Sequence, residues 1–164
     1  MTPAGVVAIA GGYNHSLALR NDGTVWTWGA NDKGQLGDGS NANRNLAAAV
    51  PSFSSVVRVT GGGNSSMALR SDGVPFVWGS NDFGELGSGT SPLSPAATSP
   101  VAVPGLTGVT DLAVGSRPDR STAFAVLSDG SVRAWGDNNE GQACVGSNNP
   151  LIASPTTVPG LNVN

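Results

Sequence analysis

Two residues of this 164-residue chain have side chains typical of nucleophilic catalysis, one histidine and one cysteine. His15 is followed by Ser16, but neighbouring residues on a strand point to opposite faces, so they cannot form a direct Ser–His pair. Cys144 has no base near it in the sequence, and we expect a neutral, partly buried thiol. Nothing in the sequence supplies the nucleophile, base and orienting group of an enzyme.

Acidic residues gather in glycine-rich segments, which suggests calcium because carboxylate oxygens bind that ion. Their spacing matches no EF-hand, however, and Asn, Asp and Gly are ordinary turn residues. Gly61-Gly62-Gly63 lacks the Lys-Ser/Thr pair of a phosphate loop. We therefore predict a protein that is not an enzyme and has no metal and no cofactor. The acidic positions are Asp32, Asp38, Asp82, Asp137 and Glu140.

Composition narrows the possible partners. Charged residues make up 12% of the chain, the net charge is −3 and only eight residues are basic, whereas nucleic-acid binding requires clustered Lys and Arg. The sequence contains no apolar run near the roughly 20 residues that a membrane span requires. Met1-Thr2-Pro3 carries no basic n-region, so we expect no signal peptide. Low charge with many Ser, Thr, Asn and Gly residues is compatible with a bacterial surface or secreted parent protein.

One sequence motif occurs three times, and in each copy an Asp-Gly turn precedes a Trp-Gly pair. The spacing is near 50 residues, which indicates an array of equal supersecondary units. We assign repeats to residues 5–51, 55–104 and 108–159, with 154–164 starting the next blade. The repeated residues are Asp22, Gly23, Trp28 and Gly29, then Asp72, Gly73, Trp78 and Gly79, then Asp129, Gly130, Trp135 and Gly136.

Each unit is predicted to form short strands. Leu17 and Leu19 share one strand face while Ala18 faces the other way, which suits sheets buried on both sides. Asp-Gly predicts a two-residue type I′ hairpin, and Val-Pro closes each unit at a strand end. The segments 41–49 and 91–99 are polar and are predicted as surface loops. The fold class is therefore all-β, with about three four-stranded antiparallel β-propeller blades, as a partial propeller or assembling into a ring.

Other repeat folds fit less well. A β-helix has shorter coils, and WD repeats end in Trp-Asp, which is absent. Kelch repeats also run near 50 residues and carry a Gly-Gly doublet. Gly11-Gly12 and Gly61-Gly62 match that doublet, but the third unit lacks it and the Trp is followed by Gly.

The string Gly12, His15-Ser16-Leu17-Ala18-Leu19, Asp22-Gly23, Val25, Trp28-Gly29, Asn31, Gly34-Gln35-Leu36-Gly37 closely resembles the regulator of chromosome condensation repeat. The resemblance covers almost the whole chain and implies propellers of about seven blades, closed when the last strand completes the blade that the first strands began. It makes His15 a structural, hydrogen-bonded residue. The family's best-known member exchanges nucleotide on a small GTPase and docks on nucleosomes, and some relatives inhibit β-lactamases. Those contact residues lie outside the repeat motif and cannot be transferred to this chain.

The third unit departs from the pattern. Ala143 and Cys144 stand where the first two units have Leu and Gly. An insertion, Arg117-Pro118-Asp119-Arg120, is placed at the position that His15 holds in unit one. The tail from Ser154 also repeats the segment that begins at Ser99, so head and tail are complementary, and one copy's tail could complete another copy's first blade.

The leading interpretation is a non-enzymatic scaffold for protein–protein recognition through variable blade loops. Its partner is another protein or other copies of itself, as a homo-oligomer or as a fragment of a longer propeller. The alternatives are a guanine-nucleotide exchange factor-like regulator of a small GTPase and an inhibitor of an enzyme such as a β-lactamase. Interfaces favour aromatic and Arg anchors, and packing at blade seams is the competing explanation for the same residues. The predicted partner-binding residues are Tyr13, Trp26, Lys33, Phe83, Arg117, Arg120 and Arg133.

Overall fold

The computed structural model describes residues 5–89 and 95–162 of the chain. Within these ranges the chain forms three four-stranded sheets, each built from strands that are consecutive in sequence. The first contains β1 (Val6–Gly11), β2 (His15–Arg20), β3 (Val25–Gly29) and β4 (Arg44–Ala49). The second contains β5 (Val56–Gly62), β6 (Ser65–Arg70), β7 (Pro75–Gly79) and β8 (Ala97–Ala102). The third contains β9 (Val109–Ser116), β10 (Ser121–Leu127), β11 (Ser131–Asp137) and β12 (Leu151–Asn162).

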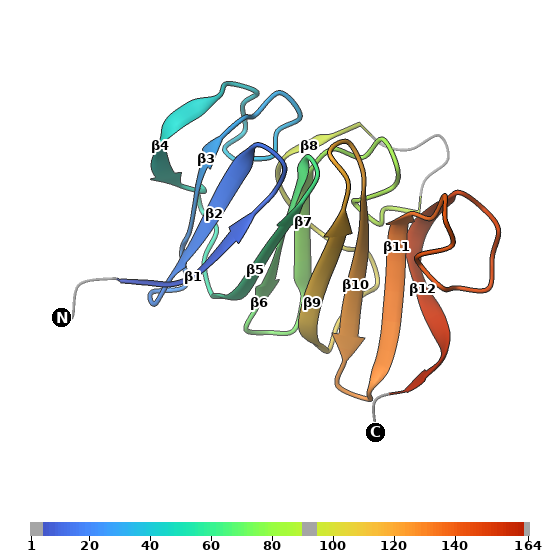
Figure 1. Ribbon diagram of the computed structural model, residues 1–164. Coiled ribbons are helices and arrows are strands. Elements are labelled where there is room, and N and C mark those ends of the chain that lie inside the picture. Colours follow the sequence, from blue (N-terminus) through green and yellow to red (C-terminus); the bar gives the residue numbers. More distant parts are fainter. Residues whose placement is uncertain (1–4, 90–94, 163–164) are drawn as a thin grey trace.

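The three sheets lie side by side in chain order (Figure 1). All strand pairs are antiparallel, and the first strands of neighbouring sheets, β1, β5 and β9, contact one another. This arrangement confirms the predicted all-β fold of four-stranded propeller blades. None of the described residues forms a helix that is long and apolar enough to cross a membrane.

The core lies between the sheets. Leu17 and Leu19 project from β2 toward the second sheet, where they pack in one cluster with Ala68 and Trp78. A second cluster fills the space between the second and third sheets and includes Trp135. Large side chains on one face of a blade therefore meet small residues and a tryptophan on the next blade, which is why both faces of each strand are apolar.

The Asp-Gly hairpins differ from the predicted type I′ turn. Gly23 has φ +78° but Asp22 does not have positive φ, whereas type I′ requires it at both central residues. The N–H of Gly23 donates to the carbonyl of Arg20 (3.0 Å), and Asp22 Oδ1 accepts from the N–H of Thr24 (3.0 Å). The turn is a three-residue loop in which only the glycine is left-handed, and the aspartate stabilises it by accepting backbone hydrogen bonds.

The fourth strands correct the prediction that residues 41–49 and 91–99 are loops. Arg44–Ala49 forms β4, and residues 97–99 belong to β8; residues 91–94 lie outside the described residues, as do Met1, Thr2 and Pro3. These strands contain alanine, asparagine and proline, which are depleted in strands. They are edge strands held by backbone pairing to β3 and β7.

The tail also differs from its assignment to a next blade. Described residues 154–162 lie in β12, which pairs with β11 and completes the third sheet. The first sheet already has four strands of its own, so head and tail do not share a blade. The insertion Arg117–Arg120 does not occupy the His15 position as predicted. It forms the β9–β10 turn, in which the N–H of Arg117 donates to the carbonyl of Arg120 (2.9 Å). Thr122 then pairs with Gly136 as His15 pairs with Gly29, so Thr122 holds the His15 position.

Candidate functional site

One end of the blades carries the long connections, which we call the loop rim. It comprises residues 12–14, 63–64 and 117–120, which join the first two strands of each sheet, and residues 30–43, 80–89, 95–96 and 138–150, which follow the Trp-Gly pairs (Figure 1). Ala30 N–H donates to the Asn14 carbonyl (2.8 Å) and Ser80 N–H to the Asn64 carbonyl (2.9 Å), so both kinds of connection meet at this end.

Each long connection begins with the same turn, built around a buried asparagine. Asn31 Oδ1 accepts from the N–H of Leu36 (2.9 Å), and Asn81 and Asn138 make the same bond in the other blades (3.0 Å each). The side chain of Gln35 accepts from the N–H of Lys33 (2.8 Å). One scaffold therefore presents a different residue at the tip of each turn: Lys33, Phe83 and Glu140.

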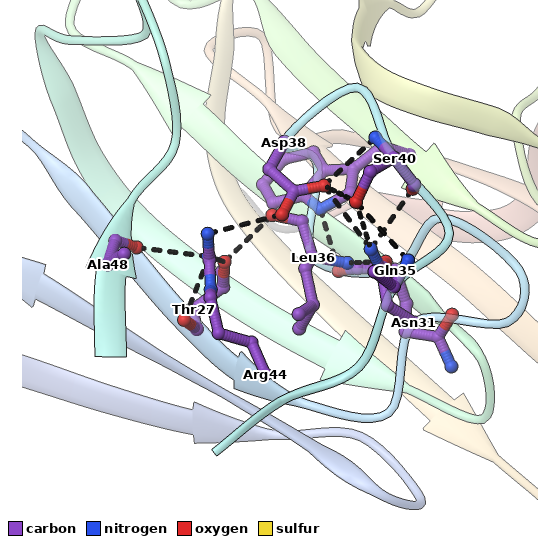
Figure 2. A network of polar contacts seen from close by, with 10 residues as sticks. Thr27, Asn31, Gln35, Leu36, Asp38, Ser40, Arg44 and Ala48 are labelled. Atoms are coloured by element: carbon purple, nitrogen blue, oxygen red, sulfur yellow. Dashed lines mark hydrogen bonds and ion pairs between the residues drawn. The ribbon is translucent and has the colours of Figure 1, made fainter. Parts of the chain in front are cut away.

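The first of these connections carries an additional ionic network, shown in Figure 2. Asp38 accepts from the N–H and Oγ of Ser40 (3.0 and 2.8 Å) and pairs with Arg44 (3.1 Å). Arg44 also donates to the carbonyls of Thr27 and Ala48 (3.1 and 3.3 Å). Burial alone would raise the pKa of Asp38, but the Ser40 hydrogen bonds and the Arg44 charge outweigh it and lower that pKa. The network fixes the connection onto β3 and β4.

The tryptophan of each later blade joins it to the turn of the blade before. Trp78 Nε1 donates to the carbonyl of Gln35, and Trp135 Nε1 donates to the carbonyl of Glu85, both at 2.9 Å. Both indoles are fully buried. Burying an indole requires a partner for its N–H, and the carbonyl of the preceding turn supplies it. Trp28, in the first blade, is only half-buried.

His15 lies in the same seam between the first two blades. Its Nε2 is 2.8 Å from Ser66 Oγ, and that hydroxyl donates to the carbonyl of Gln35 (2.8 Å). Because the single hydroxyl proton goes to the carbonyl, His15 must donate through Nε2–H, which leaves Nδ1 unprotonated and without a hydrogen-bond partner in the described part of the chain. Burial lowers the pKa of His15 from 6.5 to about 4.

This Ser–His contact joins residues 51 positions apart, and sequence reasoning missed it. The hydrogen bond runs from His15 to Ser66. In a catalytic Ser–His pair the direction is the opposite, because serine donates its proton to histidine. Both residues are buried. We assign the pair a role in fastening the two blades together.

Glu85 stands where the other two blades have Gln35 and Gln142, and it is only 3% exposed. Its Oε2 accepts from the N–H of Phe83 (2.8 Å), as the glutamines do from their own turns. Burial is the main reason that the pKa of Glu85 rises from 4.5 to about 7, and the charges of Asp82 and Asp137 add to it. The second seam therefore contains a carboxyl group that takes up a proton near neutral pH.

The rim brings together five of the seven predicted partner-binding residues: Tyr13, Lys33, Phe83, Arg117 and Arg120. Several of them also link neighbouring blades. Lys33 pairs with Asp82 (2.9 Å), and the Arg120 guanidinium lies 4.4 Å from the centre of the Phe83 ring. Tyr13 is 59% exposed.

A cavity of about 230 Å³ opens beside this cluster. Arg117, Arg120 and Phe124 line part of it. Glu140 also lines the cavity, and its carboxylate lies 3.8 Å from the guanidinium of Arg117.

Trp26 and Arg133 lie apart from the rim, on β3 and β11. Trp26 Nε1 donates to Thr24 Oγ1 (3.3 Å), and Arg133 donates to Ser131 Oγ (3.2 Å), each next to an Asp-Gly turn. Phe76, at the same position of the second blade, packs on Phe53 with ring centres 5.2 Å apart. This strand position is therefore part of the packing between blades.

Acidic residues in the rim and directly beside it hold their own turns in place. Asp32 accepts from Gln35 (3.1 Å), and Asp137 accepts from Gln142 (2.7 Å). Among residues 5–89 and 95–162 no three His, Cys, Asp or Glu side chains gather as metal ligands would. Cys144 is exposed, not partly buried as predicted.

Three antiparallel four-stranded sheets that fan side by side, joined by a repeated tryptophan contact, define blades of a β-propeller. The regulator of chromosome condensation (RCC1) repeat matches residues 22–69 and 72–117, and a second model of the same repeat matches residues 6–35 and 120–142. The chain belongs to the RCC1 repeat family.

Relatives of known sequence or structure are much longer than this chain. A stretch of 49 residues, 30% of this chain, is 45% identical to 10% of the protein RCC2 homolog of Danio rerio. The structure is similar to human WBSCR16, with a TM-score of 0.78 and 26% identity over 96% of this chain. It is also similar to Prp20p of Saccharomyces cerevisiae, described with its binding to Gsp1p and histones, with a TM-score of 0.76 and 23% identity over 93% of this chain. The chain spans 38% of each of these two solved chains.

Proposed function

We propose that this protein is a non-catalytic recognition scaffold that binds another protein through the loop rim. The observation that supports this most directly is the contrast within the repeated turn. Identical hydrogen bonds hold the turns of all three blades, while the tip residue changes from Lys33 to Phe83 to Glu140. Residues that vary on a fixed scaffold are free to serve recognition.

The chemistry of the rim suits a protein surface. Tyr13 is exposed, and the side chain of Arg117 is 59% exposed. Tyr and Arg are enriched among residues that dominate binding energy at interfaces. The guanidinium of Arg120 in the third blade lies over the ring of Phe83 in the second blade. This contact provides a preorganised aromatic and cationic surface.

The test is capture of a partner by the purified chain, followed by binding measurements with that partner purified. Tyr13→Ala combined with Arg117→Ala should weaken binding at least tenfold, since anchor residues contribute more than about 1 kcal/mol each. Phe83→Ala and Trp26→Ala test two more of the predicted anchors. Arg58→Ala is the matched control, because Arg58 lies on β5 outside the rim and pairs with Asp111 (3.2 Å). Equal affinity of the double variant and the control would exclude the rim as the binding surface.

A second candidate, nucleotide exchange on a small GTPase, follows from membership of the RCC1 repeat family, and the chain shares its fold with Prp20p, described with its binding to Gsp1p and histones. The net charge of −3 does not favour a nucleic-acid partner. Accelerated release of a labelled guanine nucleotide from a small GTPase would support exchange. An inhibition assay against a panel of β-lactamases tests the enzyme-inhibitor alternative in the same way.

A further inference from the structure

Neighbouring blades of the array are joined by a repeated hydrogen bond. Across the described array, its donor is present but unused at one end, and its acceptor is present but unused at the other end. Each internal seam has a tryptophan N–H on one blade and the carbonyl of the preceding Gln or Glu on the other. At the first blade, Trp28 Nε1 has no acceptor among the described residues. At the third blade, the carbonyl of Gln142 receives no hydrogen bond from them. The donor and the acceptor of one further seam are thus both present in this chain, at opposite ends (Figure 1).

A second hydrogen bond of each internal seam follows the same pattern. Gly39 N–H donates to the carbonyl of Thr98 in the next blade, and Gly89 N–H donates to that of Ala153, both at 2.8 Å. By repeat position, the corresponding pair is the N–H of Gly146 in the third blade and the carbonyl of Asn45 in the first. The atoms of this pair belong to opposite ends of the array as well.

The apolar surfaces are also complementary. Phe53 and Leu106 follow the Val-Pro pairs of the first two blades and are buried in the seams, where the Phe53 ring lies 5.7 Å from that of Trp78. Leu161 holds the same position in the third blade and is 51% exposed. On the first blade, Trp26 and Trp28 line an apolar hollow of about 330 Å³. The internal seams show what fills such a hollow, namely the residue at the Phe53 position.

We propose that the outer face of the first sheet binds the outer face of the third sheet of a second copy. In this contact Trp28 Nε1 donates to the carbonyl of Gln142, and Leu161 packs on Trp26 and Trp28. The contact goes beyond the rim function proposed above, because it uses different surfaces, through which copies of the chain assemble. Two such contacts bring together six sheets, within the range of about four to eight blades in propellers. One contact alone gives a chain of copies.

Cys144 makes this contact looser than the internal seams. It has φ +54° at the position of Gly37 and Gly87. A Cβ atom on Gly37 would lie 2.8 Å from Trp78 Nε1, and one on Gly87 would lie 3.1 Å from Trp135. The Cβ of Cys144 therefore presses on the incoming Trp28 ring, which must shift. The structure assigns a reversible, concentration-dependent association with Cys144 beneath the partner's indole.

The experiment uses the full chain with light scattering and analytical ultracentrifugation over a range of concentrations, combined with the rate at which a thiol reagent modifies Cys144. The mass should rise above 16.3 kDa with concentration, and modification should slow in parallel because Trp28 covers the thiol. Trp28→Phe removes the N–H together with part of the ring surface and should weaken association at least fivefold. Leu161→Ala should weaken it further, while Cys144→Gly should tighten it about fivefold or more.

Tyr13→Ala is the matched control, since Tyr13 lies on the rim and should leave association unchanged. Circular dichroism checks that each variant keeps its fold. A mass of 16.3 kDa at every concentration in both the wild type and Cys144→Gly would overturn the proposal and assign the open faces to other segments. Association that Trp28→Phe and Leu161→Ala leave unchanged would also overturn it. Loss of rim binding with association intact concerns the proposed function alone, so the two failures are distinguishable.

Discussion

Replacing Glu85 with glutamine should make the free energy of unfolding less dependent on pH. The carboxyl group is buried in the second seam, accepts backbone hydrogen bonds from the N–H groups of Phe83 and of Glu85 itself, and lies near Asp82 and Asp137. Glutamine keeps the accepting oxygen and adds an N–H₂ group, which in the first blade lets Gln35 donate to Asp32 (3.1 Å). The protein itself thus shows that glutamine fits this turn in two of its three blades.

The size of the effect follows from the proton affinity of the folded state. The pKa of Glu85 is about 7 in the fold and 4.5 in the unfolded chain, and one pKa unit corresponds to about 1.4 kcal/mol. Because the folded state binds the proton more tightly, Glu85 contributes stability below pH 4.5 that is lost as pH rises to about 7. The loss amounts to about 3 kcal/mol at and above pH 8.

The assay is urea unfolding followed by tryptophan fluorescence, at several values between pH 4.5 and pH 8. Glu85→Gln should be close to the wild type in stability at the acid end and more stable by about 3 kcal/mol at the alkaline end. The difference between the two proteins isolates Glu85 from His15, which titrates in the opposite direction over part of this range. Gln35→Glu is the reciprocal control and should introduce a similar loss at alkaline pH. A stability difference that stays constant from pH 5 to pH 8 would refute the reasoning.

Three further predictions follow from the seams. In the Glu85→Gln background, stability should fall by about 3 kcal/mol as pH drops from 6.5 to 4, because His15 has a pKa of about 4 in the fold, and His15→Gln should remove this dependence in pH-resolved urea titrations. Trp135→Phe should cost about 2 kcal/mol or more, because it removes the hydrogen bond to the Glu85 carbonyl and leaves a cavity where the indole is fully buried. Trp28→Phe should cost less in the dilute protein, because Trp28 is only half-buried. Gly37→Ala should cost about 1–3 kcal/mol more than Gly141→Ala in thermal unfolding, since both have positive φ but only the first meets a tryptophan ring; equal losses would contradict this.

Much of the fold could be predicted from local patterns. The alternation Leu17-Ala18-Leu19 indicated a strand buried on both faces, and the Trp-Gly spacing indicated three equal units. These features are local, because side-chain direction in a strand has a period of two. The fourth strands could not be found in this way, since alanine-rich segments such as Arg44–Ala49 have little strand preference and pair only because β3 lies beside them.

The candidate site was predictable in part. Tyr13, Lys33, Phe83, Arg117 and Arg120 were selected as variable or exposed residues, and the fold places all of them on one rim. Whether that rim binds a partner stays a prediction. The contacts among the rim residues join different blades, as Arg120 and Phe83 do, and no spacing within one repeat could indicate them.

The sequence by itself determined the unit: a turn, strand and tryptophan pattern that recurs because each blade has the same backbone hydrogen bonds to satisfy. The tertiary structure alone decided what lies between units. It made His15 and Ser66 partners, raised the pKa of Glu85, and left Trp28 half-buried and Leu161 exposed at opposite ends. The physical reason is that burial and hydrogen-bond partners at a seam depend on a neighbouring blade some 50 residues away, which the local pattern of one repeat does not specify.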